Sequence, residues 1–541
     1  MKKMKKVMAL LLSLVMVLAM SVVAFAEEAG SSAAATSGTY TITAPNNGHT
    51  YEVYQIFKGA LNNVDGQQIL SDLKWGISGT GTEGAVVEAD VLQDIEGVIG
   101  DDTAKLAVIT KYIKKDSTTG KILTTAKFGE VTFATPLQNV PAGYYLIKDV
   151  DGAFKDQYDS YTKYIVEIVD NVEISPKADK PSVEKKVKEN KKYTGEGTDE
   201  TYGSQYNDTA DYSIGDAVPF KLIGTVPDMS QYKTYKYTFH DTLSKAFNAP
   251  TVADVKVYVA DNKAGNGKIE VTSGFITTVD ANTITVSTTD LKKIEYNKGS
   301  EKAVGVSVGQ YIIVEYTAVL NANARIEKET FEDRTGNINK VYLTYSNNPN
   351  QSGDGESEEG KTPEDKVIVF TYKLSAEKID GKTNAKLSGV TFKLYRLEND
   401  AKIWAKVTNG KLSAWTDDEK QATGLTSDAE GKFSVAGLDD GQYFIKEVKA
   451  LPGYNTIDDT EVTISANTSN SQGGNGDVTE LAEINLVSGG KTGTVVTITN
   501  NKGSNLPSTG GMGTTIFYVV GSILVLGAAI LLITKKRMSA R

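Results

Sequence analysis

Two lysines in this sequence occupy positions from which a strand would direct them into an apolar interior. Lys185 lies two positions from both Val183 and Val187, and Lys378 lies four positions after Leu374. Alternate residues of a strand share one face, so each lysine is grouped with apolar side chains. Burial lowers the pKa of a lysine and raises that of a carboxylic acid. Because a free amine attacks carbonyl carbon and an ammonium does not, a buried lysine beside an acid is a candidate nucleophile.

The sequence offers few other reactive groups. It contains no cysteine and only two histidines, His49 and His240, which are far apart in the chain. We therefore predict no metal site, no cofactor and no enzymatic turnover. Scattered carboxylates leave a glycosidase-type pair as an open alternative. The formal net charge of −10 argues against a nucleic-acid partner.

Both ends of the chain carry export signals. Residues 1–26 combine a basic start, an apolar core and a terminal Ala-Phe-Ala, which predicts a secretory signal peptide cleaved after Ala26. Near the other end, the uncharged residues 514–534 are sufficient for one membrane-spanning helix, and three cations follow them. Before this run stand Leu506, Pro507, Ser508, Thr509 and Gly510.

The elements that must position the lysines are short strands. Alternating segments rich in Tyr, Val and Thr predict an all-β chain of tandem sandwich domains, with short helices near residues 86–99 and 103–113. The prolines of the expected linker interrupt strand pairing and place Lys177 in an exposed segment. The predicted organisation is an N-terminal domain (27–175), a linker (176–181), a middle domain (182–365), a C-terminal domain (366–503) and a terminal signal (506–541).

The pentapeptide, the apolar run and the basic tail together resemble the LPXTG sorting signal of Gram-positive surface proteins. The resemblance implies that a sortase cysteine cleaves between Thr509 and Gly510 and passes the threonyl group to an amine. It also implies a secreted protein anchored in the cell wall.

The segment Tyr443-Phe444-Ile445-Lys446-Glu447, with Pro-Gly-Tyr close behind, is similar to the E-box of Cna B-type domains. Members of that family form an internal amide between lysine and asparagine. The matching residues here are Lys378, Glu447 and Asn500. A protonated Glu447 would hydrogen-bond the carboxamide oxygen of Asn500 and carry a proton to the departing ammonia.

The middle domain resembles the related Cna A-type domain, and the resemblance implies Lys185 as nucleophile and Asp241 as acid. Asn339 is the preferred acceptor because it begins the closing strand, and Asn347 on the same face remains a rival. Lys186 lies on the other strand face.

For the first domain, no internal bond is expected. Asp149 stands where an E-box glutamate would, Lys58 follows the opening strand, and Asn171 is the one candidate acceptor.

Over nearly its whole length the chain resembles the SpaA-like major pilins of sortase-assembled pili. In that family an acceptor lysine lies in Tyr-Pro-Lys after the first domain, and the matching tripeptide here is Ser175-Pro176-Lys177, with Ser in place of Tyr. The resemblance implies that Thr509 of one subunit is joined to Lys177 of the next. Such a head-to-tail contact does not close on itself and therefore propagates into a fibre.

The partners implied are other copies of the chain, pilin and housekeeping sortases, minor pilins and peptidoglycan. A role in adhesion would add a host surface ligand. The alternative is a monomeric LPXTG-anchored adhesin or a minor tip or basal pilin, which would lack a working Lys177.

Overall fold

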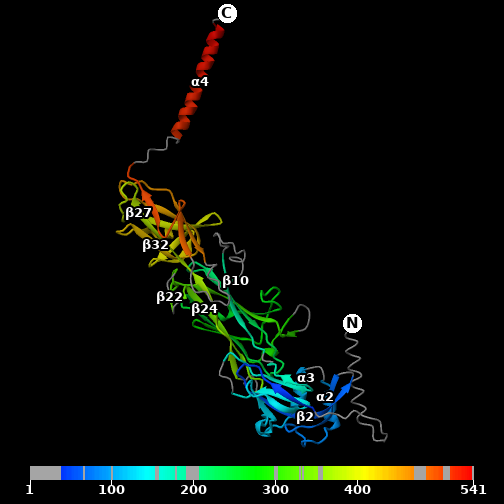
Figure 1. Ribbon diagram of the computed structural model, residues 1–541. Helices are drawn as coiled ribbons and strands as arrows, with labels where there is room; N and C mark the ends of the chain where they lie inside the picture. Colours follow the sequence, from blue (N-terminus) through cyan, green and yellow to red (C-terminus); the bar gives the residue numbers. More distant parts are fainter. Residues whose placement is uncertain are drawn as a thin grey trace.

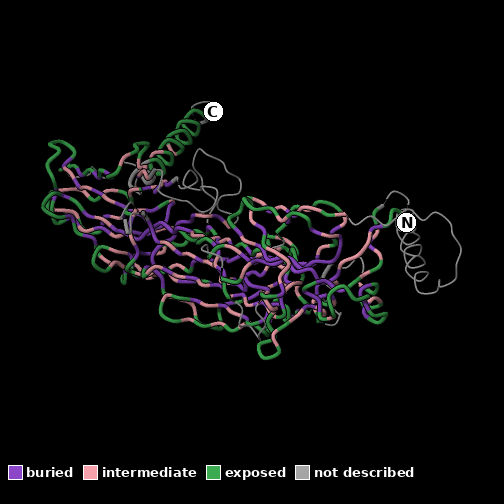
Figure 2. Tube along the Cα trace, turned by 60° about the horizontal axis from the view of Figure 1, so that its bottom comes forward, coloured by how far each residue is buried: buried purple, intermediate pink, exposed green. Residues whose placement is uncertain are grey.

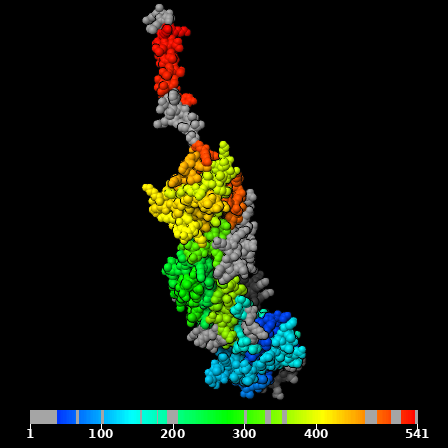
Figure 3. Space-filling model, turned by 90° about the vertical axis from the view of Figure 1, so that its left-hand side faces the viewer, coloured from blue at the N-terminus to red at the C-terminus, as the bar shows by residue number. Residues whose placement is uncertain are grey.

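The computed structural model describes residues 38–64, 67–98, 102–152, 157–176, 179–190, 206–297, 303–327, 330–331, 334–350, 358–467, 483–503 and 512–538. The expected signal peptide with Ala26, the lysine Lys177 and the pentapeptide 506–510 lie outside these residues. Strands dominate the described chain, which confirms the all-β prediction. The strands form three successive units along an elongated body (Figures 1 and 3), termed here the first, middle and third unit.

The first unit combines a three-stranded and a five-stranded sheet with two short helices. The helices lie where the sequence predicts them, and the sheet orders are β5-β1-β8 and β3-β2-β6-β7, with β4 paired to β2. Its elements are β1 (Thr39–Thr43), β2 (Tyr51–Val64), β3 (Gln67–Trp75), α2 (Ala89–Glu96), α3 (Asp102–Ile109), β4 (Gly129–Val131), β5 (Leu137–Pro141), β6 (Gly143–Asp149), β7 (Lys163–Ile168) and β8 (Val172–Glu173).

The middle unit is a sandwich of two seven-stranded sheets that enclose one large apolar core, and it also contains two two-stranded sheets, β19-β20 and β22-β23. One sheet has the order β10-β9-β12-β21-β15-β16, with β14 paired to β21, and the other has the order β11-β26-β24-β13-β18-β17, with β25 paired to β24. The elements are β9 (Val183–Lys188), β10 (Tyr206–Asn207), β11 (Thr209–Asp211), β12 (Ala217–Thr225), β13 (Tyr237–Leu243), β14 (Phe247–Asn248), β15 (Lys256–Ala260), β16 (Ile269–Glu270), β17 (Ile276–Asp280), β18 (Thr283–Thr288), β19 (Glu295–Tyr296), β20 (Val304–Gly305), β21 (Tyr311–Leu320), β22 (Thr330–Phe331), β23 (Arg334–Thr335), β24 (Asn337–Ser346), β25 (Glu359–Lys361) and β26 (Asp365–Phe370).

The third unit is built from one eleven-stranded sheet, in which the first strand β27 and the last strand β37 pair in parallel. The order is β36-β35-β34-β33-β28-β29-β30-β32-β27-β37, with β31 paired to β28. The elements are β27 (Tyr372–Asp380), β28 (Thr391–Glu398), β29 (Ala401–Thr408), β30 (Lys411–Thr416), β31 (Leu425–Thr426), β32 (Lys432–Leu438), β33 (Gly441–Lys449), β34 (Thr460–Asn467), β35 (Glu483–Ser488), β36 (Lys491–Gly493) and β37 (Val496–Asn500).

Buried residues follow the strands through the interior of all three units, whereas the helix α4 (Met512–Met538) has no buried residue over Tyr518–Lys536 (Figure 2). By length and composition α4 is suited to cross a membrane, and it contains the span expected from the sequence. An apolar helix with no protein cover is stable only where lipid replaces that cover.

The middle and third units share the strand β26, at the boundary expected near residue 365. Its residues alternate between two cores: Val367 and Val369 join the middle core, while Ile368 and Phe370 join the third. Such alternation follows from the two-residue period of a strand. The strand therefore couples the two units because its backbone pairs within the middle unit while its side chains are buried in both cores.

A second contact between these units depends on a glycine. The backbone N–H of Ile214 donates to the carbonyl of Gly437 at 2.9 Å. Gly437 has a φ of +83°, and a Cβ added there would lie 2.4 Å from Cδ1 of Ile214. Only glycine satisfies both the backbone angle and the close approach.

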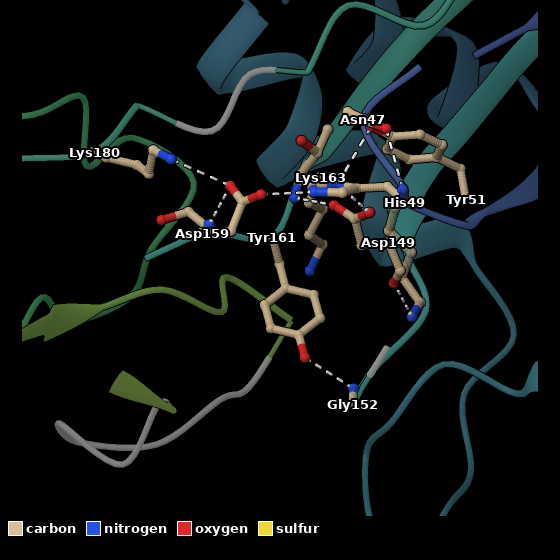
Figure 4. A network of polar contacts seen from close by, with 12 residues as sticks. Asn47, His49, Tyr51, Asp149, Gly152, Asp159, Tyr161, Lys163 and Lys180 are labelled. Atoms are coloured by element: carbon tan, nitrogen blue, oxygen red, sulfur yellow. Dashed lines mark hydrogen bonds and ion pairs between the residues drawn. The ribbon is translucent and has the colours of Figure 1, made fainter. Parts of the chain in front are cut away.

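The first and middle units meet around His49. Its Nδ1 lies 3.1 Å from Oδ1 of Asp149, and its Nε2 lies 2.8 Å from Oδ2 of Asp159 (Figure 4). The other oxygen of Asp159 is 3.4 Å from Nζ of Lys180, and the Asp159 carbonyl accepts a hydrogen bond from Nδ2 of Asn347 at 3.2 Å. Through Asp159, His49 thus connects the first core to Lys180 of the expected linker and to Asn347 of the middle unit.

The charge state of His49 affects this junction. Burial alone would lower its pKa, but the hydrogen bonds and charges of the two aspartates outweigh burial, so the pKa lies above its ordinary value. A raised histidine pKa contributes stability that is fully present below the unfolded value of 6.5 and is lost as pH rises through the folded value.

We expect Gly437→Ala to destabilise the chain by about 2–4 kcal/mol, from backbone strain plus the clash with Ile214. Gly410→Ala is the matched control, because Gly410 has a φ of +76° with no atom near its added Cβ, and it should cost about 1–2 kcal/mol. Chemical denaturation measures both. Equal costs would show that the close approach to Ile214 contributes nothing.

We expect the unfolding free energy of the first unit to fall as pH rises above 6.5, and His49→Gln to remove this dependence while costing on the order of 3 kcal/mol at pH 6. Trp75 fluorescence reports on this unit in a chain carrying Trp404→Phe and Trp415→Phe. His240→Gln, in the middle unit, is the control. A pH slope that survives His49→Gln would assign it to another group.

Candidate functional site: two buried lysine–acid–asparagine clusters

The third unit brings its predicted lysine, acid and asparagine into direct contact. Nζ of Lys378 donates to Oδ1 of Asn500 at 2.6 Å and lies 2.9 Å from Oε2 of Glu447. Nδ2 of Asn500 donates to Oε1 of Glu447 at 3.0 Å. The three side chains come from β27, β37 and β33, and all are buried. Residues far apart in sequence therefore form one closed triangle of contacts.

The surroundings of this cluster favour a reactive amine. Nζ of Lys378 lies 5.6 Å from the centre of the Phe392 ring, and apolar residues fill the same core. Burial lowers the pKa of Lys378, and the opposing influence of Glu447 does not cancel the effect. The fraction of lysine present as the free amine is therefore larger than it would be in water.

One detail of the expected chemistry is corrected by this geometry. The sequence-based mechanism has Glu447 polarising the carboxamide oxygen of Asn500, but in the structure Glu447 meets the amide nitrogen while the oxygen faces Lys378. Glu447 is thus positioned beside the nitrogen that would depart as ammonia. A 180° rotation of the carboxamide exchanges the two contacts.

The middle unit gathers its predicted residues around an additional side chain. Nζ of Lys185 donates to Oδ2 of Asp241 at 2.5 Å and to the hydroxyl of Tyr316 at 3.2 Å. The Tyr316 hydroxyl donates to Oδ2 of Asp241 at 2.8 Å and accepts from Nδ2 of Asn339 at 2.7 Å. Lys185, Asp241 and Asn339 have no exposed surface.

Burial acts on both ionisable partners of the middle cluster. It lowers the pKa of Lys185 and raises that of Asp241, in each case as the largest influence. Each shift disfavours the charged form, so the neutral amine and the protonated acid are both promoted. The cluster meets the two requirements for attack on a carboxamide.

Tyr316 was missed by the sequence analysis. It lies in β21 on the face of Ile312 and Val314, so its inward direction follows from simple alternation. Many tyrosines of this chain also alternate with apolar residues, and the sequence gives no sign of which one reaches the lysine.

The rival candidates of the middle unit lie elsewhere. Asn347 directs its amide nitrogen to the carbonyl of Asp159, in the first unit. Lys186 lies on the outward face and pairs with Asp208. Asn339, and not Asn347, therefore contacts the Tyr316 hydroxyl that the lysine also contacts.

The three candidates of the first unit do not converge. Nζ of Lys58 lies 3.7 Å from a carboxylate oxygen of Glu83, Asp149 contacts His49, and Oδ1 of Asn171 accepts from the N–H of Thr41. Among the described residues of this unit, these side chains form no cluster of the kind found in the other two.

A group of carboxylates at the junction of the middle and third units was also not anticipated. Asp211, Asp439 and Asp440 are buried and offer oxygen atoms within 4.8 Å of one another. Burial, followed by the nearby charge of Glu189, holds the pKa of Asp211 well above its ordinary value. The raised pKa favours the protonated form of Asp211. Asp211 ends β11, whereas Asp439 and Asp440 lie in the turn between β32 and β33, more than 200 residues later, so their proximity could not be predicted from the sequence.

Two families match parts of the chain. Residues 372–476 match SpaA, a prealbumin-like fold domain, and residues 498–539 match the LPXTG cell wall anchor motif. The trypsin-resistant surface T6 protein of Streptococcus pyogenes serotype M6 is 28% identical over 285 residues, a match covering 41% of this chain and 48% of the T6 protein. The chain thus spans about half the length of this relative.

Solved structures of pilus proteins show a looser likeness. The T6 backbone pilin of Streptococcus pyogenes has a TM-score of 0.43 and 18% identity, covering 86% of this chain and 98% of that one. The major pilin SpaD of Corynebacterium diphtheriae has a TM-score of 0.41 and 19% identity, with coverage of 86% and 98%. At TM-scores this low, the similarity is not evidence for how the units of this chain are arranged.

The matched segments coincide with the features that the sequence analysis singled out. The SpaA match contains Lys378 and Glu447, and the anchor match contains Asn500 and the pentapeptide. These matches confirm the SpaA-like resemblance and the surface location. The chain is therefore a secreted, cell-wall-anchored protein with a SpaA-type prealbumin-like domain.

Proposed function

We propose that this chain is the major structural subunit of a covalent surface pilus, stabilised by internal lysine–asparagine amides. The observation that carries the proposal is the contact of Lys378 with both Asn500 and Glu447 in a buried core. The LPXTG anchor and the relation to a streptococcal surface protein add to it. The chain acts as a structural protein, and each bond forms once.

The bond in the third unit forms by attack of the free Lys378 amine on the side-chain carbonyl carbon of Asn500. Glu447 accepts a proton from the amine and returns one to the amide nitrogen, which leaves as ammonia. The fold supplies most of the rate, since it holds the reacting groups in contact before reaction. The middle unit forms the equivalent bond between Lys185 and Asn339, with Asp241 as the acid.

These bonds suit a fibre under tension. In the third unit, Lys378 and Asn500 belong to the first and last strands, which pair directly. An amide between these strands prevents the unit from being drawn out between its ends. It also limits the unfolded chain as a disulfide does, but reduction cannot break it.

Polymer growth uses the two ends of the exported chain. A sortase cleaves after Thr509 and transfers its acyl group to Lys177 of the next subunit, and a housekeeping sortase finally attaches the fibre to peptidoglycan. Lys177 lies between Pro176 and Asp179, both exposed, which suits an amine that an enzyme must reach. Minor pilins and a host ligand would join through this assembly.

We expect Lys177→Arg to abolish the high-mass ladder on denaturing gels of cell-wall extract, because the guanidinium does not accept the acyl group. Lys180→Arg is the matched control: Lys180 is exposed, lies three residues further on and pairs with Asp159, and its substitution should leave the ladder intact. A ladder that persists in Lys177→Arg would reject this lysine. Monomers in the unaltered chain would favour a wall-anchored adhesin.

We expect the purified chain to weigh less than its calculated mass by one ammonia for each internal bond. Asn500→Ala should restore one ammonia and lower the unfolding free energy by about 5 kcal/mol, the chain-entropy value for so long a loop. Asn501→Ala, at the adjacent exposed position, is the control. The full calculated mass in the unaltered chain would reject the bonds.

A further inference from the structure

We propose that Tyr316 is a catalytic residue of the middle unit, which relays a proton from Asp241 to the departing amide nitrogen of Asn339. The inference rests on the proposed Lys185–Asn339 bond and adds a fourth residue to its chemistry. It follows from a difference between the two clusters.

The difference concerns the reach of the acid. In the third unit, the two oxygens of Glu447 contact the amine and the amide nitrogen separately, at 2.9 and 3.0 Å. In the middle unit, Oδ2 of Asp241 contacts the amine, while Oδ1 has no hydrogen-bond partner in the described structure. An aspartate is one methylene shorter than a glutamate. Asp241 therefore contacts the Lys185 amine but does not reach the amide nitrogen of Asn339.

Tyr316 fills this gap. Its hydroxyl is the atom that contacts the amine, the acid and the amide nitrogen, at 3.2, 2.8 and 2.7 Å. A hydroxyl is both donor and acceptor, so it can receive a proton from one side and release another to the other side. It therefore replaces the direct contact that Glu447 makes.

The ring is held firmly in place. Tyr316 is buried, its ring lies 5.4 Å from that of Phe220, and Nζ of Lys185 lies 5.2 Å from the Phe220 ring. Burial, followed by the charge of Asp241, holds the pKa of Tyr316 well above its ordinary value. The hydroxyl keeps its proton at neutral pH and acts as a relay, not as a phenolate base.

The proton transfers balance without any other reactant. Nζ of the neutral Lys185 bonds to the side-chain carbonyl carbon of Asn339, and the bond from that carbon to Nδ2 breaks. Tyr316 gives its proton to Nδ2 and takes the acid proton of Asp241, so that nitrogen leaves as ammonia. Asp241 then takes one proton from the former amine. The products are an amide and ammonia, and both Asp241 and Tyr316 return to their initial states.

The test is Tyr316→Phe, which removes the hydroxyl and keeps the ring. After a pulse of labelled synthesis, the peptide that joins Lys185 to Asn339 is quantified over time by mass spectrometry of the full chain. We expect its formation to slow by about a hundredfold, as is typical when an acid–base group is lost. The Lys378–Asn500 peptide in the same sample should form at its normal rate.

Tyr235→Phe is the matched control. Tyr235 is fully buried in the same core, and its hydroxyl has no partner among the described residues. Its loss removes a buried tyrosine hydroxyl without touching the cluster, so the bond should form as in the unaltered chain.

A rescue variant separates catalysis from packing. Asp241→Glu lengthens the acid, and in combination with Tyr316→Phe it should restore bond formation by letting the acid reach the amide directly. The relay would be overturned if the Lys185–Asn339 bond formed at its normal rate in Tyr316→Phe. It would also be overturned if the bond formed slowly in Tyr316→Phe and Asp241→Glu did not restore its rate, or if Tyr316→Phe lost the circular-dichroism signal of the folded chain. No bond in the unaltered chain would reject the proposed bond itself.

Discussion

A lysine amine enclosed by apolar side chains is the feature on which the rest of this protein depends. Transfer of an ammonium into such surroundings is costly, and an acid beside it reduces the cost only in part. Burial lowers the lysine pKa in both clusters. The fold thus favours the free amine in both clusters, and in the third unit it places that amine in contact with a carboxamide. A permanent amide is one way to remove the unfavourable pair.

The strands that carry each cluster determine which parts of a unit an internal amide would join. A chain without cysteine cannot use disulfides, yet a fibre of the kind we propose must resist both force and proteolysis. In the third unit the reactive strands are the first and last of the sheet. In the middle unit, Lys185 and Asn339 come from the opening strand of one sheet and a central strand of the other. Bonds at these places close each unit on itself.

Contacts between units are made differently. The middle and third units share β26 and a glycine contact, whereas the first unit is attached around a histidine whose charge varies with pH. The first unit buries Lys148 beside Glu52, but neither side chain contacts an asparagine among its described residues, so its stability depends on packing and ion pairs. Such a unit opens more readily than its neighbours.

The sequence alone was sufficient for the class of fold, the sorting signal and the inward direction of Lys185 and Lys378, because alternation and composition are local properties. It did not specify which side chains those lysines would meet. The choice of Asn339 over Asn347, the contact of Glu447 with the amide nitrogen, and the central place of Tyr316 all depend on which strands pair and in which register. Register is fixed by contacts between segments far apart in the chain, so the tertiary structure alone decides it.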